Sequence, residues 1–250
     1  MKISKKDWKK YIARLRNVNE RAADRIAEYI RTHDISTEEG LKALLDYSYA
    51  VATEYGEAAT ELACQMYDAV AQASGANVPA AEPAATATYG ETVRAVKGKL
   101  FDTVDPDAVA ASVGRLVKTA GVDTTMQNAL RDGAEWAWVP SGDTCAYCLM
   151  LASQGWVRAS RDAIRNGHAE HIHNNCDCTF QIRFNNKTSV EGYDPDALYD
   201  EYIGSGKTRR ERLNAIRRKL YAKDRDRINE QKREAYRRRK AQEAAGKEQQ

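Results

Sequence analysis

Apolar residues recur at steps of three and four along the first third of the chain, with charged residues between them. Such spacing places the apolar side chains on one stripe of a helix. In residues 1–32 this stripe consists of Trp8, Tyr11, Ile12, Leu15, Val18, Ala22, Ile26 and Ile30. A capping-box signature at Ser36–Glu39 then opens a second periodic segment that runs to about Ser74. Two long helices joined by a short turn predict an αα-hairpin.

The helical pattern stops at Gly75, where two prolines stand among alanines. This composition favours an irregular linker over 76–88 and makes it the best boundary between domains. Beyond the linker, periodicity predicts helices over 89–100, 105–120 and 123–131. Asp105 is the expected N-cap of the second of these helices, and Gly121 lies just past its expected end.

The apolar period then changes from helical to alternating. Residues 134–140 and 179–184 each alternate large apolar with other side chains, which predicts two short strands that can pair with each other. Further helices are expected from Asp194 and from Thr208, the second of them rich in Arg and Lys and running to about Ala244.

These elements predict a mainly α protein with a small α+β module. The expected parts are an N-terminal helical hairpin over 1–75, the Ala/Pro linker over 76–88, an α+β module over 89–190, and a helix with a basic C-terminal tail over 191–250.

The formal net charge of +3 conceals an asymmetry along the chain. Residues 207–250 hold 17 Lys and Arg against 7 Asp and Glu, and the other 206 residues hold 22 against 29. A basic tail on an acidic body favours contact with DNA or with an acidic protein surface, although a solvated, salt-laced helix would have the same composition. No apolar run is long enough to span a bilayer and no secretory signal opens the chain, so we expect no membrane partner and a reducing cytoplasm.

Four of the five cysteines and three of the four histidines lie between Cys145 and Cys178. Thiolate and imidazole are the ligands that Zn²⁺ prefers, and a CxxC pair brings two sulfurs to one ion. The sequence therefore offers a structural zinc site of the Cys₄ or Cys₃His type. The candidate ligands are Cys145, Cys148, His173, Cys176 and Cys178, with His171 as an alternative to His173.

Other interpretations of the cluster remain open. Cysteine also serves as a small buried apolar residue, and thiols can be catalytic or redox-active. A catalytic thiol is disfavoured because nothing singles out one nucleophile among four cysteines. A His-Asn-His nuclease is suggested by His171–Asn175, but no histidine follows His173 to complete that motif. The sequence thus predicts no enzyme, with a zinc nuclease as the rival.

The segment Trp138-Val-Pro-Ser-Gly-Asp-Thr-Cys145-Ala-Tyr-Cys148, followed by His173-Asn-Asn-Cys176-Asp-Cys178 and a strand, resembles the phage Mu protein F-like minor head proteins of tailed bacteriophages. The resemblance covers about residues 45–185. It implies a protein made in the host cytoplasm and built into the virion head near the portal, where it assists head morphogenesis. The implied partners are the portal and major capsid proteins, with packaged DNA a further partner through 207–250.

Some members of that family carry a protease or toxin domain, and an ADP-ribosyltransferase-like fold has been attributed to others. This chain shows neither a Ser/His/Asp nor a Ser/Lys set after residue 185, and no Arg, Ser-Thr-Ser and Glu-x-Glu set for NAD chemistry. An ADP-ribosyltransferase-like enzyme and a simple nucleic-acid-binding module stand as alternatives to the head protein.

Overall fold

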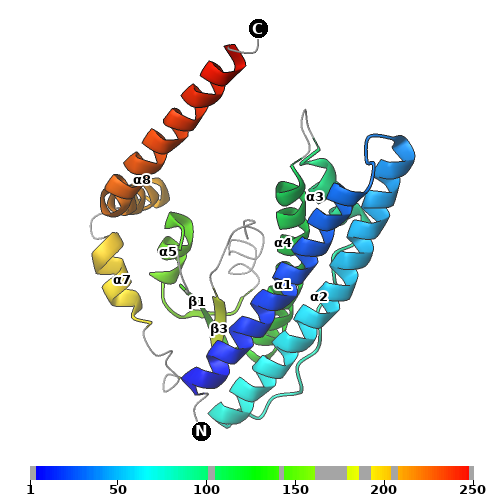
Figure 1. The fold of residues 1–250 in the computed structure, drawn as a ribbon. Coiled ribbons are helices and arrows are strands. Elements are labelled where there is room, and N and C mark those ends of the chain that lie inside the picture. Colours follow the sequence, from blue (N-terminus) through cyan, green and yellow to red (C-terminus); the bar gives the residue numbers. More distant parts are fainter. Residues whose placement is uncertain are drawn as a thin grey trace.

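Three long helices lie side by side in a computed structural model of the chain (Figure 1). They are α1 (Lys5–Thr32), α2 (Glu38–Ser74) and α4 (Pro106–Asp132). The structure describes residues 4–100, 105–140, 144–160, 179–185, 193–203 and 208–247. The predicted N-terminal hairpin is α1 with α2, and its predicted apolar stripe supplies the buried Ala22, Ile26 and Ile30.

Hydroxyl side chains cap both helices of the hairpin. Ser4 accepts a hydrogen bond from the backbone N–H of Asp7, and Thr37 accepts one from the N–H of Gly40 at 3.0 Å. The capping box predicted at Ser36–Glu39 is therefore wrong by one residue. Ser36 instead donates its N–H and its hydroxyl to the carboxylate of Asp34, which forms the turn between the helices.

Helix α4 is continuous, so the predicted helix end at Gly121 is wrong. A Cβ at this position would lie 3.3 Å from the carbonyl oxygen of Ala59 in α2. Glycine therefore allows two helix backbones to approach closely here, and the intrahelical hydrogen bonds carry the helix past it. The actual end is at Gly133, which adopts the left-handed conformation with φ 66°.

The order of the helices in the bundle requires a long return of the chain. Helices α1 and α4 are antiparallel, with Arg31 at the end of α1 paired to Asp107 at the start of α4 at 2.7 Å. Because α1 and α2 are also antiparallel, α2 and α4 run in the same direction. Residues 76–88, called the strap below, run back between them to the short helix α3 (Tyr89–Lys97), which starts with a capping box between Thr88 and Glu91.

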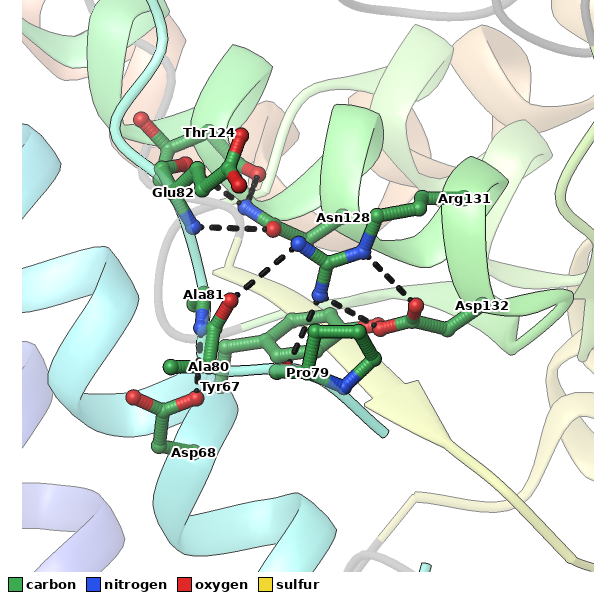
Figure 2. Close-up of polar contacts among 10 residues, drawn as sticks. All are labelled: Tyr67, Asp68, Pro79, Ala80, Ala81, Glu82, Thr124, Asn128, Arg131 and Asp132. Carbon is green, nitrogen blue, oxygen red and sulfur yellow. Dashed lines mark hydrogen bonds and ion pairs between the residues drawn. The ribbon is translucent and has the colours of Figure 1, made fainter. Parts of the chain in front are cut away.

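Side chains of α4 bind the strap backbone (Figure 2). The buried amide of Asn128 accepts from the N–H of Glu82 at 3.0 Å and donates to the carbonyl of the same residue at 2.8 Å. The hydroxyl of Thr124, which is fully buried, accepts from the N–H of Ala84 at 3.0 Å. On the other side of the strap, the carboxylate of Asp68 in α2 accepts a hydrogen bond from the backbone N–H of Ala81. The predicted linker therefore has no helix or strand, as expected, but its backbone is hydrogen-bonded to both α2 and α4.

An ion pair between neighbouring residues fastens the start of the strap. Arg131 donates to the carbonyl oxygens of Pro79 and Ala80 at 3.0 and 3.1 Å and binds both carboxylate oxygens of Asp132 (Figure 2). Burial opposes ionisation of Asp132, but hydrogen bonds from Arg131 and from the Tyr67 hydroxyl lower its pKa overall. Burial and donation to Asp132 raise the pKa of Tyr67, so the phenol stays protonated.

A small antiparallel sheet follows the bundle in the order β2-β1-β3. The predicted strands are confirmed as β1 (Glu135–Val139) and β3 (Thr179–Arg183), which pair with each other as expected. The two-residue strand β2 (Val157–Arg158) was not predicted. Trp136 and Trp138 of β1 stand opposite Ile182 and Phe180 of β3, so four large apolar side chains share one face.

Helices α5 (Ala146–Ala152), α7 (Pro195–Tyr202) and α8 (Arg209–Lys247) complete the described chain. Only the first part of α8 packs on the body, where Ile216 is fully buried and Leu213 and Leu220 lie beside the same core. The rest of α8 leaves the body (Figure 1). No helix in the described ranges is long and apolar enough to span a membrane. The predicted fold class is confirmed: the chain is mainly helical with one small sheet.

Candidate functional site

Cys145 and Cys148, called the knuckle below, stand at the start of α5. Cys145 is the N-cap residue, and its Sγ accepts a hydrogen bond from the backbone N–H of Cys148 at 3.4 Å. Cys148 is buried and Cys145 is half-buried. The N-terminal turn of α5 thus holds the Cys145 sulfur in place through a backbone N–H.

The other predicted zinc ligands cannot be compared with the knuckle. His173, Cys176 and Cys178, and the alternative His171, lie outside the described residues. Within the ranges that the structure describes, no three His, Cys, Asp or Glu side chains are grouped closely enough to hold a metal ion. The knuckle has two thiols, and a structural zinc site uses four donors.

The pairing of β1 with β3 brings together two strand ends, one that precedes Cys145 in the sequence and one that follows Cys178. Val139, the last residue of β1, pairs with Thr179, the first residue of β3, and the Thr179 hydroxyl donates to the Val139 carbonyl at 3.1 Å. Thr179 directly follows Cys178 in the sequence, and Cys145 comes six residues after Val139. The chain therefore enters the knuckle and leaves the second cysteine pair from the same end of this two-stranded ladder.

Tyr147, between the two cysteines, links the knuckle to the basic helix α8. Arg209, the first residue of α8, donates to the Tyr147 hydroxyl at 2.5 Å, and its guanidinium lies 5.2 Å from the centre of the same ring. Sequence reasoning missed this contact because the two residues are 62 positions apart. The contact orients the start of α8 relative to α5.

Aromatic side chains close the core between the knuckle and the sheet. Phe180 lies 4.9 Å from Trp136 and 5.1 Å from Trp138, measured between ring centres. The same core contains Cys148. On the other edge, Arg183 pairs with Glu135 at 2.5 Å and lies over the ring of Trp156 at 4.7 Å. These contacts give the strands and the knuckle one rigid support.

The fifth cysteine has a different environment. Cys64 lies on α2 and is buried, and its burial raises the pKa of the thiol, to which Glu61 and Asp68 add. Cys64 is therefore protonated at neutral pH and acts as a small apolar residue of the bundle. It provides a natural comparison for the knuckle cysteines.

Comparison with known proteins identifies one family. Residues 2–205 match the family model described as VG15 protein, a range that includes the bundle, the strap, the sheet, the knuckle and α7 and stops before α8. No curated protein and no solved structure matches the chain.

Proposed function

Because the chain belongs to the VG15 family of viral and phage gene products, we propose that it is a minor structural protein of a phage head that assists head morphogenesis near the portal. The observation that carries the proposal is the segment resembling Mu protein F-like head proteins. Its described part, from Trp138 through the knuckle, forms a packed unit with the sheet at the end of the helical bundle. In this proposal the bundle of α1, α2 and α4 is the docking arm toward the portal and the major capsid protein.

We propose that a structural zinc ion holds the knuckle to the second half of the motif. Cys145 and Cys148 would supply two sulfurs, and Cys176 and Cys178, or His173 in place of one of them, would supply the rest. Two features support this proposal: the Cys145 sulfur already accepts an N–H, and Cys178 precedes the first residue of β3. A bound zinc ion would cross-link the long segment between the two cysteine pairs to the sheet.

Metal analysis of the purified chain tests the zinc proposal. We expect one zinc per chain, lost in Cys145→Ser together with some stability, and retained in Cys64→Ser because Cys64 lies in the bundle core. His173→Ala and Cys176→Ser then identify the fourth ligand. A wild-type chain without zinc, or a Cys145→Ser variant that keeps it, would contradict the proposal.

We further propose that the chain is not an enzyme, because the knuckle is built as a helix cap and no single thiol is set apart as a nucleophile. A zinc nuclease or an ADP-ribosyltransferase-like enzyme is the rival. The two differ in what Cys145→Ser does: a structural site loses zinc and stability together, whereas a catalytic site loses activity with the fold intact.

The head assignment itself is tested on purified virions. Mass spectrometry of particles should find the protein in few copies per head, and particles assembled without it should show fewer complete heads. Residues 207–250 are proposed to contact packaged DNA or acidic capsid and portal surfaces. A protein that is absent from purified virions and needed only in the infected cell would contradict the head assignment.

A further inference from the structure

The first half of α1 is a basic surface that is separate from the C-terminal tail. Residues 2–16 contain seven Lys or Arg side chains and a single acid, Asp7. Lys6, Lys10 and Arg14 are spaced four residues apart, and all three are exposed. This spacing puts them in one row along the helix, rising about 6 Å per step. These residues belong to the start of α1, and Figure 1 shows that end of α1 at the opposite end of the molecule from the far end of α8.

The cations of this row differ from the arginines farther along the same helix. Arg25 pairs with Glu54 of α2 at 3.1 Å, and Arg31 pairs with Asp107 of α4 at 2.7 Å. Within the described part of the chain, no ion pair includes Lys6, Lys10 or Arg14.

Two acids, Asp7 and Glu61, line hollows together with Lys10 and Arg14, but neither forms an ion pair with the row. Asp7 accepts the Ser4 hydroxyl at 2.6 Å, and Glu61 of α2 accepts from Gln65 at 2.8 Å. Glu20 lies a turn beyond the row in the sequence. The row is therefore available for an external anion.

The position of these cations runs against the stability of the helix. The N-terminal end of a helix carries partial positive charge, so lysines in the first turns are unfavourable by a few tenths of a kcal/mol each. Lys6, Lys9 and Lys10 lie in the first two turns of α1. Since folding does not favour them there, an interaction of the folded protein is the better explanation for their presence.

Further cations lie on another side of α1. Arg16 of α1 and Arg115 of α4 line a groove of about 370 Å³ between the two helices, together with Glu20 and the small residues Ala23 and Gly114. None of Lys6, Lys10 and Arg14 lines this groove, and Lys10 and Arg14 instead line a hollow with Glu61 of α2. The cations of the groove are therefore separate from the row.

The apolar side of α1 decides against a membrane. Tyr11 and Ile12 are half-buried, and Leu15 packs against the core of the bundle. An interfacial helix needs that side free to enter lipid. Protein interfaces, for their part, are poor in Lys and have apolar centres, whereas phosphate backbones are bound mainly by Lys and Arg.

We propose that the row of Lys6, Lys10 and Arg14 binds the phosphate backbone of nucleic acid without reading its sequence. The site is distinct from the tail and does not depend on the head assignment. With basic surfaces at both ends, one chain can contact two stretches of the polymer.

Salt-dependent binding of the full chain to duplex DNA tests the proposal. Fluorescence anisotropy with a labelled duplex of about 30 base pairs, between about 50 and 200 mM salt, gives the slope of log affinity against log salt. The triple variant Lys6→Gln, Lys10→Gln and Arg14→Gln should lower the magnitude of this slope by about 2–3, since each lost phosphate contact contributes about 0.9. Its thermal midpoint should not fall, because the changed side chains are exposed and oppose the helix dipole.

A charge-matched variant provides the control. Lys42→Gln, Lys97→Gln and Lys99→Gln remove the same charge from exposed positions outside the row and should leave the slope nearly unchanged. Equal slopes for the two triple variants, or an unchanged slope for the first, would overturn the proposal. So would loss of binding to anionic vesicles or to polyglutamate by the first variant while its DNA binding stayed the same.

Discussion

Replacing Asn128 by Ala should detach the strap from α4. The Asn128 amide binds both the N–H and the carbonyl of Glu82, as the peptide group of a neighbouring strand would, and it is buried with 3% of the residue exposed. Alanine leaves both strap groups without a partner, and each buried polar group left unpaired costs about 1–3 kcal/mol. The free energy of unfolding should therefore fall by about 3 kcal/mol.

Two measurements check this value. The thermal midpoint should fall by roughly 6–12 °C, since a domain of this size loses about 2–4 °C per kcal/mol. Hydrogen exchange should show faster exchange of the strap amides, above all those of Glu82 and Ala84, whose partners lie on α4. Gln127→Ala, at the exposed neighbouring position, is the matched control and should change neither. A midpoint for Asn128→Ala equal to that of the control would refute the reasoning.

Three further predictions concern the helices. Burial, with the nearby Glu91 carboxylate adding to it, raises the pKa of Asp123 to about 6. The folded state therefore binds this proton more tightly than the unfolded state, and stability is lost as pH rises from about 4 to 6. Asp123→Asn should raise the free energy of unfolding by about 3 kcal/mol at neutral pH and change it little at pH near 4. Equal gains in urea titrations at both pH values would exclude the ionisation as the cause. Gly121→Val should cost at least about 2 kcal/mol because its side chain would force α4 away from Ala59, whereas Gly90→Val, with only a flexible arginine side chain nearby, should cost less in the same titration. A chain that ends after Ala222 should keep its denaturation midpoint, because among the described residues of α8 it is Leu213, Ile216 and Leu220 that pack on the core. Ile216→Ala should lower the free energy of unfolding by about 2–4 kcal/mol. A truncated chain as unstable as Ile216→Ala would show that the distal helix packs on the body.

Local patterns predicted the elements well, and contacts between distant residues account for what they missed. The apolar stripe of α1, the alternation in β1 and β3 and the knuckle at the start of α5 each have a period or a cap that a short window contains. Gly121 was misinterpreted because glycine marks both helix ends and close helix contacts, and only the position of Ala59 tells them apart.

The same limit applies to the polar contacts of the strap and of the knuckle. In the sequence, Asn128 has no feature that distinguishes it from other polar residues of a helix. Its role depends on Glu82 of the strap, which lies 46 residues earlier in the chain. Tyr147 likewise gives no sign of its contact with Arg209. Side chains that join segments so far apart follow no local period, so the sequence alone identified neither.

The strap also sets an order for the synthesis of this protein. Glu82 and Ala84 leave the ribosome before Asn128 and Thr124, their partners, which lie 46 and 40 residues farther along the chain. At about 5–20 residues per second, the nascent hairpin of α1 and α2 waits several seconds for α4. During that time nothing from α4 covers the small residues Gly56 and Ala59, against which the strap and α4 later pack. The hairpin therefore passes through a stage in which the surface of α2 around Gly56 and Ala59 is open to other chains. The strap and α4 cover that surface together.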